Sequence, residues 1–361
     1  MDNEKIEEGF WKDKEINGTF LIDGLIGDGG MGLVYRAHDM DDERRVVVVK
    51  TLKREELRKP YVVKHFHQEG EALGRINHDG VVKMFAQNID EETKLPFIVM
   101  ENANGPTLTA VIDRGPMDAG KCAQLVLLIA QAMTAIHAEK ILHRDIKPDN
   151  IIVVEREQEA DRVKLIDFGM AKVPWSRVGK TTAANVLVGT FDYLSPEQLN
   201  RKTITVQSEV FNLATVAYQM LTQKLAFPLY DFENERDPVT RLNELHRRGH
   251  KLLCDLRPDL PAAVDAVFKK GLALDPAERY QTPLKFAEAL RAALERKVLQ
   301  PPTTIYRPRS KWRRTWRRIL RPAALLLLLL TLAAGLYYAF WWLADAGRRG
   351  DAPKPSRAKG R

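Results

Sequence analysis

A short run of polar residues places a carboxylate, a lysine and an amide close together. The run His143-Arg144-Asp145-Ile146-Lys147-Pro148-Asp149-Asn150 follows a long apolar segment. A carboxylate such as Asp145 can accept the proton of an attacking hydroxyl group. Lys147 can neutralise negative charge that moves during a group transfer. Asn150 and the later Asp167 provide hard oxygen ligands of the kind that hold Mg²⁺ on phosphates. Together these residues predict phosphoryl transfer.

A glycine-rich run, Gly27-Asp28-Gly29-Gly30-Met31-Gly32-Leu33-Val34, lies near the start of the chain with the spacing GxGxxGxV. Glycines let the backbone approach a polyanion closely. Dinucleotide-binding turns and ordinary glycine loops can have the same spacing. A dinucleotide site requires a helix directly after the glycines, whereas Leu33-Val34-Tyr35 continues as a strand. The context therefore argues against a dinucleotide site.

Lys50 ends the four-valine run Val46–Val49. The sequence therefore predicts a lysine at the inner end of a buried strand, where lysines are uncommon. It is either an edge-strand lysine that reaches solvent or a cation aimed at phosphate. Glu69, in the next helical stretch, is a candidate partner, although most glutamates in such places are surface charges. Each motif alone has an ordinary structural explanation, but the whole ordered set does not.

In this combination the sequence resembles the protein kinases, and specifically the bacterial transmembrane Ser/Thr kinases of Hanks type. The resemblance covers about Phe20 to Leu294, some three quarters of the chain. Its bacterial character rests on the glycine loop, on Gly189-Thr190 and on the run from Tyr193 through Ser195-Pro196-Glu197 to Gln198. The resemblance implies an α+β fold of two lobes, a β-rich N-lobe with one key helix and a mostly helical C-lobe.

The resemblance also implies roles for the residues described above. Lys50 would contact the α- and β-phosphates of ATP and would pair with Glu69. Asp145 would be the catalytic base, and Lys147 would steady the γ-phosphate. The remaining ATP-binding positions form the glycine loop and the hinge that bonds adenine: Ile26, Gly27, Asp28, Gly29, Gly30, Met31, Gly32, Leu33 and Val34, with Met100, Glu101 and Ala103.

The family pattern assigns the metal to Asn150 and Asp167, which would bind Mg²⁺, with Mn²⁺ as the alternative ion. The lysine two residues after Asp145 matches the pattern of kinases that act on serine and threonine. The expected partners are therefore ATP and proteins that present Ser or Thr hydroxyl groups.

Arg144, directly before Asp145, accompanies control by phosphorylation of the activation segment in this family. A phosphate there would place close to two negative charges opposite the guanidinium group. The candidate phosphorylation sites are Thr182 and Thr181, with Ser176 behind them. The alternative is that these are ordinary loop hydroxyl groups.

Three positions depart from the family pattern. Val48 stands where an alanine is usual, which could narrow the adenine pocket. Glu209 and Ala214 replace the usual aspartate and glycine of a later helix. Val48 and Glu209 give some support to one alternative, a catalytically weak pseudokinase that acts as a nucleotide-binding scaffold. A second alternative is a small-molecule kinase of the same fold. The Ser195-Pro196-Glu197 segment, which resembles a peptide-substrate platform, argues against the second.

Periodicity predicts the elements that must position these residues. Alternating apolar runs predict a strand-rich first part, and helical spacing of apolar residues predicts a mostly helical second part. The expected strands are 20–26, 33–37, 46–52, 81–87 and 97–101. The expected helices are 61–76, 121–138, 208–221, 261–272 and 283–295.

The segment Ala323–Ala344 contains 22 residues without a charge. A helix of that length reaches roughly 33 Å, enough to cross a hydrocarbon core of roughly 30 Å. Eight basic residues lie in 307–321 and six in 345–361, which only weakly favours a cytoplasmic N-terminal side. The expectation is a single-pass protein of the cell (inner) membrane, with the kinase domain in the cytoplasm and a short tail outside. A homodimer in the lipid bilayer is one expected means of regulation.

The chain has 361 residues, 29% of them charged, and a net charge of +8. Residues 307–361 alone carry +12, which leaves a net charge of −4 on the preceding 306 residues. The basic balance thus reflects the predicted anchor and gives no support for nucleic-acid binding. The expected domains are a polar lead-in (1–18), a kinase domain (19–297, with lobes at about 19–101 and 104–297), a linker (298–322), the span (323–344) and a basic tail (345–361).

Overall fold

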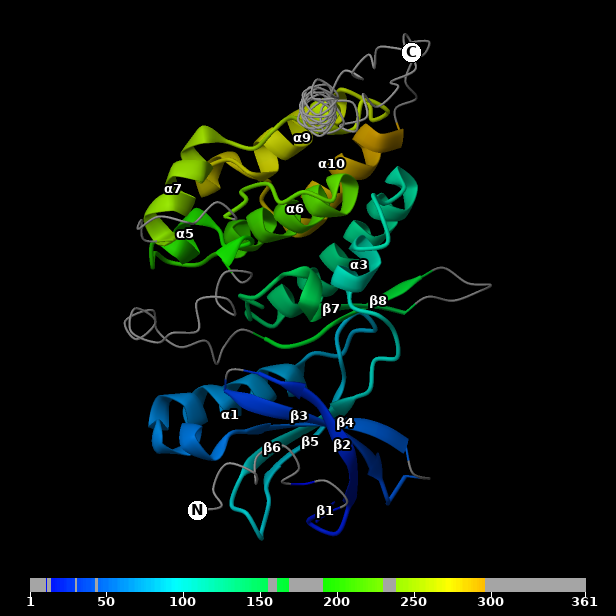
Figure 1. Cartoon of the computed structure of the whole chain (residues 1–361), viewed down its shortest axis with the longest axis vertical. Helices are drawn as coiled ribbons and strands as arrows, with labels where there is room; N and C mark the ends of the chain where they lie inside the picture. The colour runs from blue at the N-terminus through cyan, green and yellow to red at the C-terminus, as the bar shows by residue number, and fades with distance from the viewer. Residues whose placement is uncertain are drawn as a thin grey trace, which may run out of the picture. The chain divides into compact units, whose positions relative to one another are not determined.

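The computed structural model describes Trp11 and residues 14–29, 31–42, 45–154, 161–168, 191–229 and 238–295. These residues belong to one compact unit and form two lobes, one built on a β-sheet and one mostly helical (Figure 1). Gly30, Thr181, Thr182 and the predicted span 323–344 lie outside the described residues. Within the described residues the expected order, a strand-rich part followed by a helical part, is present.

The N-lobe sheet has the strand order β1-β2-β3-β4-β6-β5, and its paired neighbours are antiparallel. Its strands are β1 (Glu15–Ile16), β2 (Phe20–Asp28), β3 (Gly32–Asp39), β4 (Arg45–Leu52), β5 (Met84–Ile89) and β6 (Pro96–Glu101). Because β3 is a strand and not a helix, the prediction that excluded a dinucleotide-binding turn is confirmed.

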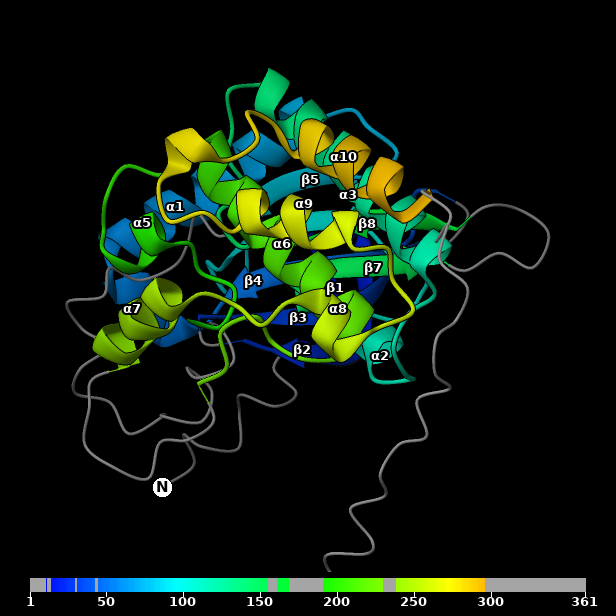
Figure 2. The same ribbon diagram turned by 90° about the horizontal axis from the view of Figure 1, so that it is seen from above.

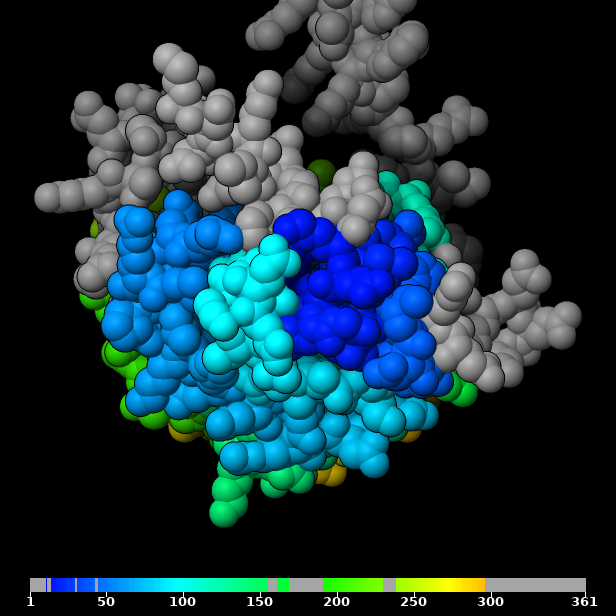
Figure 3. Space-filling model, turned by 90° about the horizontal axis from the view of Figure 1, so that it is seen from below, coloured from blue at the N-terminus to red at the C-terminus, as the bar shows by residue number. Residues whose placement is uncertain are grey.

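Alternation along β4 separates the two faces of this sheet. Val47 and Val49 are fully buried in a cluster with Trp11, Tyr35 and other apolar side chains. The sheet curls around this cluster. Its first turn meets its last strand, where the Asn17 side chain donates to the Ile89 carbonyl oxygen at 3.1 Å. From the N-lobe end, the β2–β3 region lies beside the β5–β6 hairpin (Figure 3).

The predicted polar lead-in needs a correction. Trp11 is only 1% exposed, and its ring lies 5.5 Å from that of Tyr35. Ile16 is equally buried and belongs to β1. An aromatic ring and a paired strand at these positions bury apolar surface that would otherwise face water. The folded N-lobe therefore begins before residue 19.

The other face of the sheet packs against helix α1 (Pro60–Arg75), whose first residue is a proline, the residue type most easily accepted at a helix start. A 3₁₀ turn, η1 (Arg54–Arg58), leads into it. Val62 and Phe66 on α1 are buried in the larger apolar cluster of the molecule. Their spacing, together with Glu69 and Leu73, turns one stripe of α1 toward the sheet.

The predicted strand 81–87 begins three residues before the observed strand β5 and ends two residues before it. The structure places β5 at Met84–Ile89, because Val81 and Val82 pair instead with Leu165 of the C-lobe. Apolar alternation cannot tell which partner strand a residue will choose.

The C-lobe is built on long helices. They are α3 (Ala119–Ala138), α6 (Val206–Thr222), α7 (Pro238–Arg248), α9 (Ala263–Gly271) and α10 (Pro283–Glu295), with short helices α2 (Leu108–Ile112), α5 (Pro196–Leu199) and α8 (Leu253–Leu256). Helix α10 packs along α3, and α9 packs against α6 (Figure 2). Helix α7 was missed by the sequence reading, because only Leu242 and His246 are buried on it.

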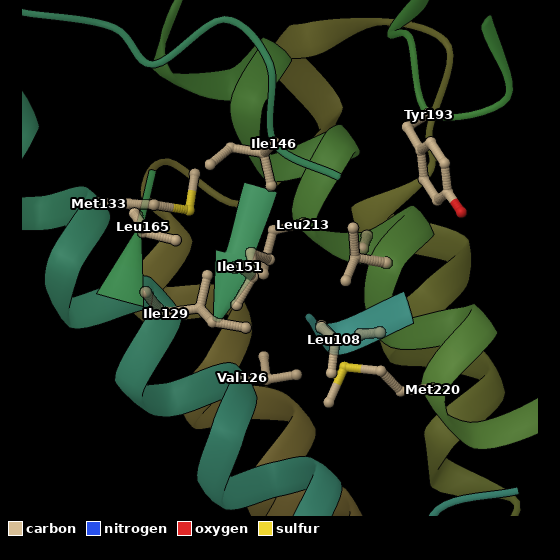
Figure 4. Close-up of a cluster of buried hydrophobic side chains, with 14 of the residues drawn as sticks. Leu108, Val126, Ile129, Met133, Ile146, Ile151, Leu165, Tyr193, Leu213 and Met220 are labelled. Atoms are coloured by element: carbon tan, nitrogen blue, oxygen red, sulfur yellow. The ribbon is translucent and has the colours of Figure 1, made fainter. Parts of the chain in front are cut away.

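Helix α3 is the one described helix long and apolar enough to cross a membrane, and half of the relevant stretch is buried inside the protein. Its side chains Val126, Ile129 and Met133 point into the cluster shown in Figure 4. Ile146, the neighbour of Asp145, reaches into the same cluster. The apolar side chains of α3 thus lie in the same cluster as Ile146, in the loop that carries Asp145.

Candidate active site

A small hairpin brings two separate polar motifs to one point. Strands β7 (Ile151–Val154) and β8 (Arg162–Leu165) pair antiparallel, with Ile151 opposite Leu165. Asn150 comes directly before β7, and Asp167 comes two residues after β8. The Ile166 N–H donates to the Asn150 carbonyl oxygen at 3.0 Å, so the two motifs lie side by side.

Asn150 also binds the residue expected to act as the base. Its side-chain nitrogen donates to the backbone oxygen and to a carboxylate oxygen of Asp145, both at 2.9 Å. The amide oxygen, which is the atom that binds cations, therefore lies on the opposite side of the planar group. Lys147 Nζ is 3.8 Å from the same Asp145 carboxylate. Asp145, Lys147 and Asn150 thus form one local cluster.

Arg144, in the catalytic loop directly before Asp145, has an uncommon backbone conformation, with a φ of 66°. Both of its peptide groups are bound by buried side chains. The Arg144 N–H donates to Glu209 Oε1 at 2.5 Å, and its carbonyl oxygen accepts from Gln198 Nε2 at 3.0 Å. Glu209 is fully buried, and its second oxygen lies 2.6 Å from His137 Nε2. The glutamate that departs from the family pattern therefore still anchors this loop.

Lys50 joins the N-lobe to the C-lobe. Its Nζ donates to Glu69 Oε1 at 2.7 Å and to Asp167 Oδ1 at 2.9 Å. Burial by itself would lower the pKa of Lys50, but the two carboxylates outweigh it and hold that pKa above its ordinary value. The Lys50 charge in turn lowers the pKa of Asp167. Both groups are therefore charged at neutral pH.

The glycine loop is a tight β2–β3 turn, in which the Gly29 N–H donates to the Gly32 carbonyl oxygen at 2.9 Å. A Cβ on Gly32 would lie 2.4 Å from the Thr51 carbonyl oxygen, so only glycine fits there. Asp28 pairs with Lys53 at 2.7 Å, which ties the loop to the end of β4. Ile26, on β2 two residues before Asp28, is 55% exposed.

The expected hinge begins where β6 ends. Met100 is buried, and Val48 lies directly opposite it on β4. The Glu101 carboxylate accepts from Lys164 Nζ of β8 at 2.7 Å and from the Lys83 N–H at 3.1 Å. This segment is therefore tied to the C-lobe through the Glu101 side chain, while Ala103 follows in irregular backbone.

Asp167 and Asn150 form a donor set that suits a divalent ion held partly by a nucleotide. Within the described ranges, no three His, Cys, Asp or Glu side chains cluster into a self-sufficient metal site. Mg²⁺ commonly takes one or two protein oxygens and completes its shell with phosphates and water. One carboxylate and one amide oxygen at the end of the same hairpin match that requirement.

Comparison with known families decides what this arrangement is. Residues 20–292 match the family model described as the protein kinase domain. The chain belongs to the protein kinase family. The match begins after Trp11 and β1, so this part of the N-lobe lies outside the family model.

Several bacterial kinases are similar to this kinase. The serine/threonine-protein kinase Pkn1 of Myxococcus xanthus is 33% identical over 281 residues, which cover 78% of this chain and 39% of that protein. The serine/threonine-protein kinase PknB of Mycobacterium tuberculosis is 32% identical over 285 residues, covering 78% of this chain and 43% of that protein. The chain thus spans about half the length, or less, of these relatives.

Solved structures show the same fold. A crystal structure of the Mycobacterium tuberculosis PknI kinase domain matches with a TM-score of 0.58 and 22% identity, over 78% of this chain and 98% of that one. The resemblance to bacterial Ser/Thr kinases and the expected two-lobed fold are therefore confirmed. Members of this family use ATP with a divalent metal ion.

Two features of the kinase site were not singled out by the sequence reading. His143 is fully buried, its ring stacks 4.7 Å from that of Phe168, and its Nε2 lies 3.1 Å from the Ile166 carbonyl oxygen. Burial lowers its pKa, so the ring is neutral and Nε2–H donates. His143 is part of the motif His143-Arg144-Asp145, but the sequence suggested a chemical role only for the charged Arg144 and Asp145.

The second missed feature is an ion pair made by Glu197, in the Ser195-Pro196-Glu197 segment expected to form the substrate platform. Arg279 donates to both carboxylate oxygens of Glu197, at 2.6 and 3.0 Å, and both side chains are buried. Its other donors reach carbonyl oxygens, including that of Ala273 at 2.8 Å. A bidentate pair with every donor engaged is a stable way to bury these charges. The residues are 82 apart, so the sequence alone could not pair them.

Proposed function

We propose that this chain is a serine/threonine protein kinase that transfers the γ-phosphoryl group of ATP to Ser and Thr hydroxyl groups of proteins. One observation carries the proposal. Lys50 Nζ is bonded to Glu69 of the N-lobe and to Asp167 of the C-lobe, so both halves of the site are assembled around one cation. The similarity to named bacterial Ser/Thr kinases supports the same activity.

In the proposed reaction, the substrate hydroxyl oxygen attacks the γ-phosphorus while the bond to the β-phosphate oxygen breaks. Asp145 orients the hydroxyl group and takes its proton, and ADP leaves with the bridging oxygen. Lys147, beside the Asp145 carboxylate, stabilises charge on the transferred group. Lys50 holds the α- and β-phosphates, and the Ile26–Val34 loop covers them.

Asn150 and Asp167 would hold Mg²⁺, which neutralises phosphate charge when bound, with Mn²⁺ as the alternative. In the hinge, the Glu101 N–H already donates to the Lys83 carbonyl oxygen at 2.8 Å. Adenine would therefore use the other backbone groups of the segment from Met100 to Ala103. Val48, opposite Met100, would narrow the space around the adenine ring.

The test uses the full chain purified in detergent and incubated with labelled ATP and a peptide library. We expect labelling of Ser and Thr peptides by the wild type and none by Lys50→Met or Asp145→Asn. Lys121→Met is the matched control, because Lys121 pairs with Asp161 away from the site. Nucleotide binding without transfer by the wild type would favour the pseudokinase alternative, and equal labelling by all variants would exclude the assigned roles.

Membrane anchoring is a second part of the proposal. The 22 uncharged residues of 323–344, between basic flanks, support a single span at the cell membrane, after a kinase domain that ends at about residue 297 and a linker of 298–322. ATP places the kinase domain in the cytoplasm and the short tail outside. Fractionation of full-length and 1–306 protein tests this: recovery of the full chain in the soluble fraction would contradict the span.

Activation by autophosphorylation is the third part. Arg144 and the hydroxyl groups of Thr181 and Thr182 support it, since a phosphate there could pair with the guanidinium group. Mass spectrometry of wild type and Asp145→Asn after incubation with ATP is the test. Phosphate on Thr181 or Thr182 in the wild type alone supports the proposal.

If activity per molecule is independent of concentration in detergent, regulation by homodimerisation is excluded.

A further inference from the structure

Helix α1 has two glycines, Gly70 and Gly74, on the side that faces β5. Each glycine inside a helix costs about 1 kcal/mol relative to alanine, so their presence needs a reason. A Cβ on Gly70 would lie 2.3 Å from Gln87 Oε1, and a Cβ on Gly74 would lie 2.8 Å from Met84 Cε. Both neighbours belong to β5. Two β5 side chains therefore press against bare helix backbone.

The Gln87 contact is also polar. Its side-chain nitrogen donates to the His67 carbonyl oxygen at 3.2 Å and lies 3.1 Å from His67 Nδ1. His67 comes two residues before Glu69 on the same helix. At 100° per residue, Gly70 lies on the helix surface between the Glu69 flank and the His67 flank. The amide of Gln87 thus occupies the space left by the missing Gly70 side chain and binds the helix there.

One row of the sheet carries both contacts to α1. Lys50 is opposite Ile98, and Ile98 is opposite Gln87, across strands β4, β6 and β5. Residues directly opposite each other in a sheet point to the same face. Ile98 is fully buried in the cluster that contains Phe66 of α1, so this face is the one toward the helix. Lys50 binds Glu69, and Gln87, two strands away, binds His67.

We propose that Gln87 is a positioning residue for phosphoryl transfer. It touches neither nucleotide nor hydroxyl substrate. Its amide fixes the rotation of α1 about the helix axis, so that Glu69 meets Lys50. Two polar contacts from one row of the sheet define this rotation more closely than the apolar stripe of α1 and the Lys50 contact would without Gln87. The role in catalysis rests on the kinase function proposed above.

The test compares three changes in the full-length protein. Gln87→Met keeps the bulk and removes the amide. Gly70→Ala adds a methyl group that displaces the amide, although helix propensity alone would make this change stabilising. The double variant Gly70→Ala/Gln87→Ala removes both the amide and the clash. Gly74→Ala is the matched control, because its neighbour is the movable end of Met84.

We expect Gln87→Met and Gly70→Ala each to lower kcat about fivefold, the effect of about one hydrogen bond, with KM for ATP nearly unchanged. The double variant should lose no more than either single change. Amide hydrogen exchange of α1 should become faster in these three and stay near wild type in Gly74→Ala. Thermal melting would verify that each variant is folded.

Several results would overturn the proposal. They are wild-type kcat and wild-type exchange of α1 in Gln87→Met, a Gly70→Ala variant that is more stable with unchanged kcat, or multiplicative losses in the double variant. Failure of the kinase function itself would look different, because the wild type would then transfer no phosphate. In that case unchanged exchange of α1 in Gln87→Met would still reject the contact, and faster exchange would still support it.

Discussion

The Asp145 half and the Lys50 half of the site are held in different ways. On the Asp145 side, buried Glu209 and Gln198 bind the two peptide groups of Arg144, and neither lies on the loop itself. On the Lys50 side, the pair with Glu69 depends on where a whole helix lies. The first arrangement is part of the core, so it should be coupled to stability. The second can change with little unfolding, so it should be coupled to activity.

Removal of the Glu209 carboxylate should have the largest effect. Glu209→Ala leaves the Arg144 N–H without its acceptor and His137 without its partner in a buried site. We expect a loss of about 3 kcal/mol in the free energy of unfolding, together with nearly all activity. Urea denaturation and the peptide assay measure the two effects.

Glu209→Asp is the matched variant, because it restores the residue type usual in the family. Its shorter side chain can reach Arg144 or His137 less well, so we expect a loss of about 1 kcal/mol. If Glu209→Ala lowered activity but left stability at the wild-type value, the Asp145 half would not be part of the core and the comparison would fail.

A buried carboxyl group of the C-lobe, Asp192, should give the next largest effect, through its protonation. Burial raises the pKa of Asp192 to about 7, although a backbone hydrogen bond from Leu229 opposes the shift. Between its unfolded pKa of about 4 and 7, the native state keeps a proton that the unfolded chain releases. Stability from this group therefore falls as pH rises, by about 2 kcal/mol between pH 5 and 7.

On the Lys50 side, burial likewise raises the pKa of Glu69, so this carboxyl group contributes stability that also falls as pH rises. The depressed pKa of Asp167 gives stability that is lost only as pH falls through it, and the raised pKa of Lys50 gives stability that is lost only at high pH. Asp192→Asn should therefore reduce the slope of the unfolding free energies measured at pH 5, 6, 7 and 8, without removing the part that belongs to Glu69. An equal slope in wild type and variant would exclude Asp192 as the source.

The chemistry-bearing residues could be predicted from the sequence because their types and spacing are local. Asp145, Lys147 and Asn150 lie within six residues, and Lys50 follows a strand of recognisable pattern. Glu209 was noted only as a departure, since its contact with Arg144 spans 65 residues. No sequence pattern indicated the roles of Trp11 and Gln87. The burial of Trp11 and the contact of Gln87 with helix α1 both depend on the folded sheet.

Neutralising Glu69 should change activity more than stability. Glu69→Gln keeps the shape but removes the charge opposite Lys50, which retains Asp167 as a partner. We expect kcat/KM to fall about tenfold, equivalent to about 1.4 kcal/mol, with a smaller change in unfolding free energy. Glu71→Gln, at an exposed position of the same helix, is the control. A stability loss as large as that of Glu209→Ala would make the two halves alike.

The contact between Lys164 and Glu101 should give the smallest effect. This pair joins β8 to the end of the hinge and is partly exposed, so its net energy is about 0.2–1 kcal/mol. Lys164→Met should raise KM for ATP about twofold to threefold, because the hinge that binds adenine is less well fixed, and should leave kcat and stability unchanged. Lys121→Met breaks a similar pair with Asp161 away from the hinge and should change neither constant. A fall in kcat with constant KM would instead show that Lys164 acts on the chemical step and not on adenine binding.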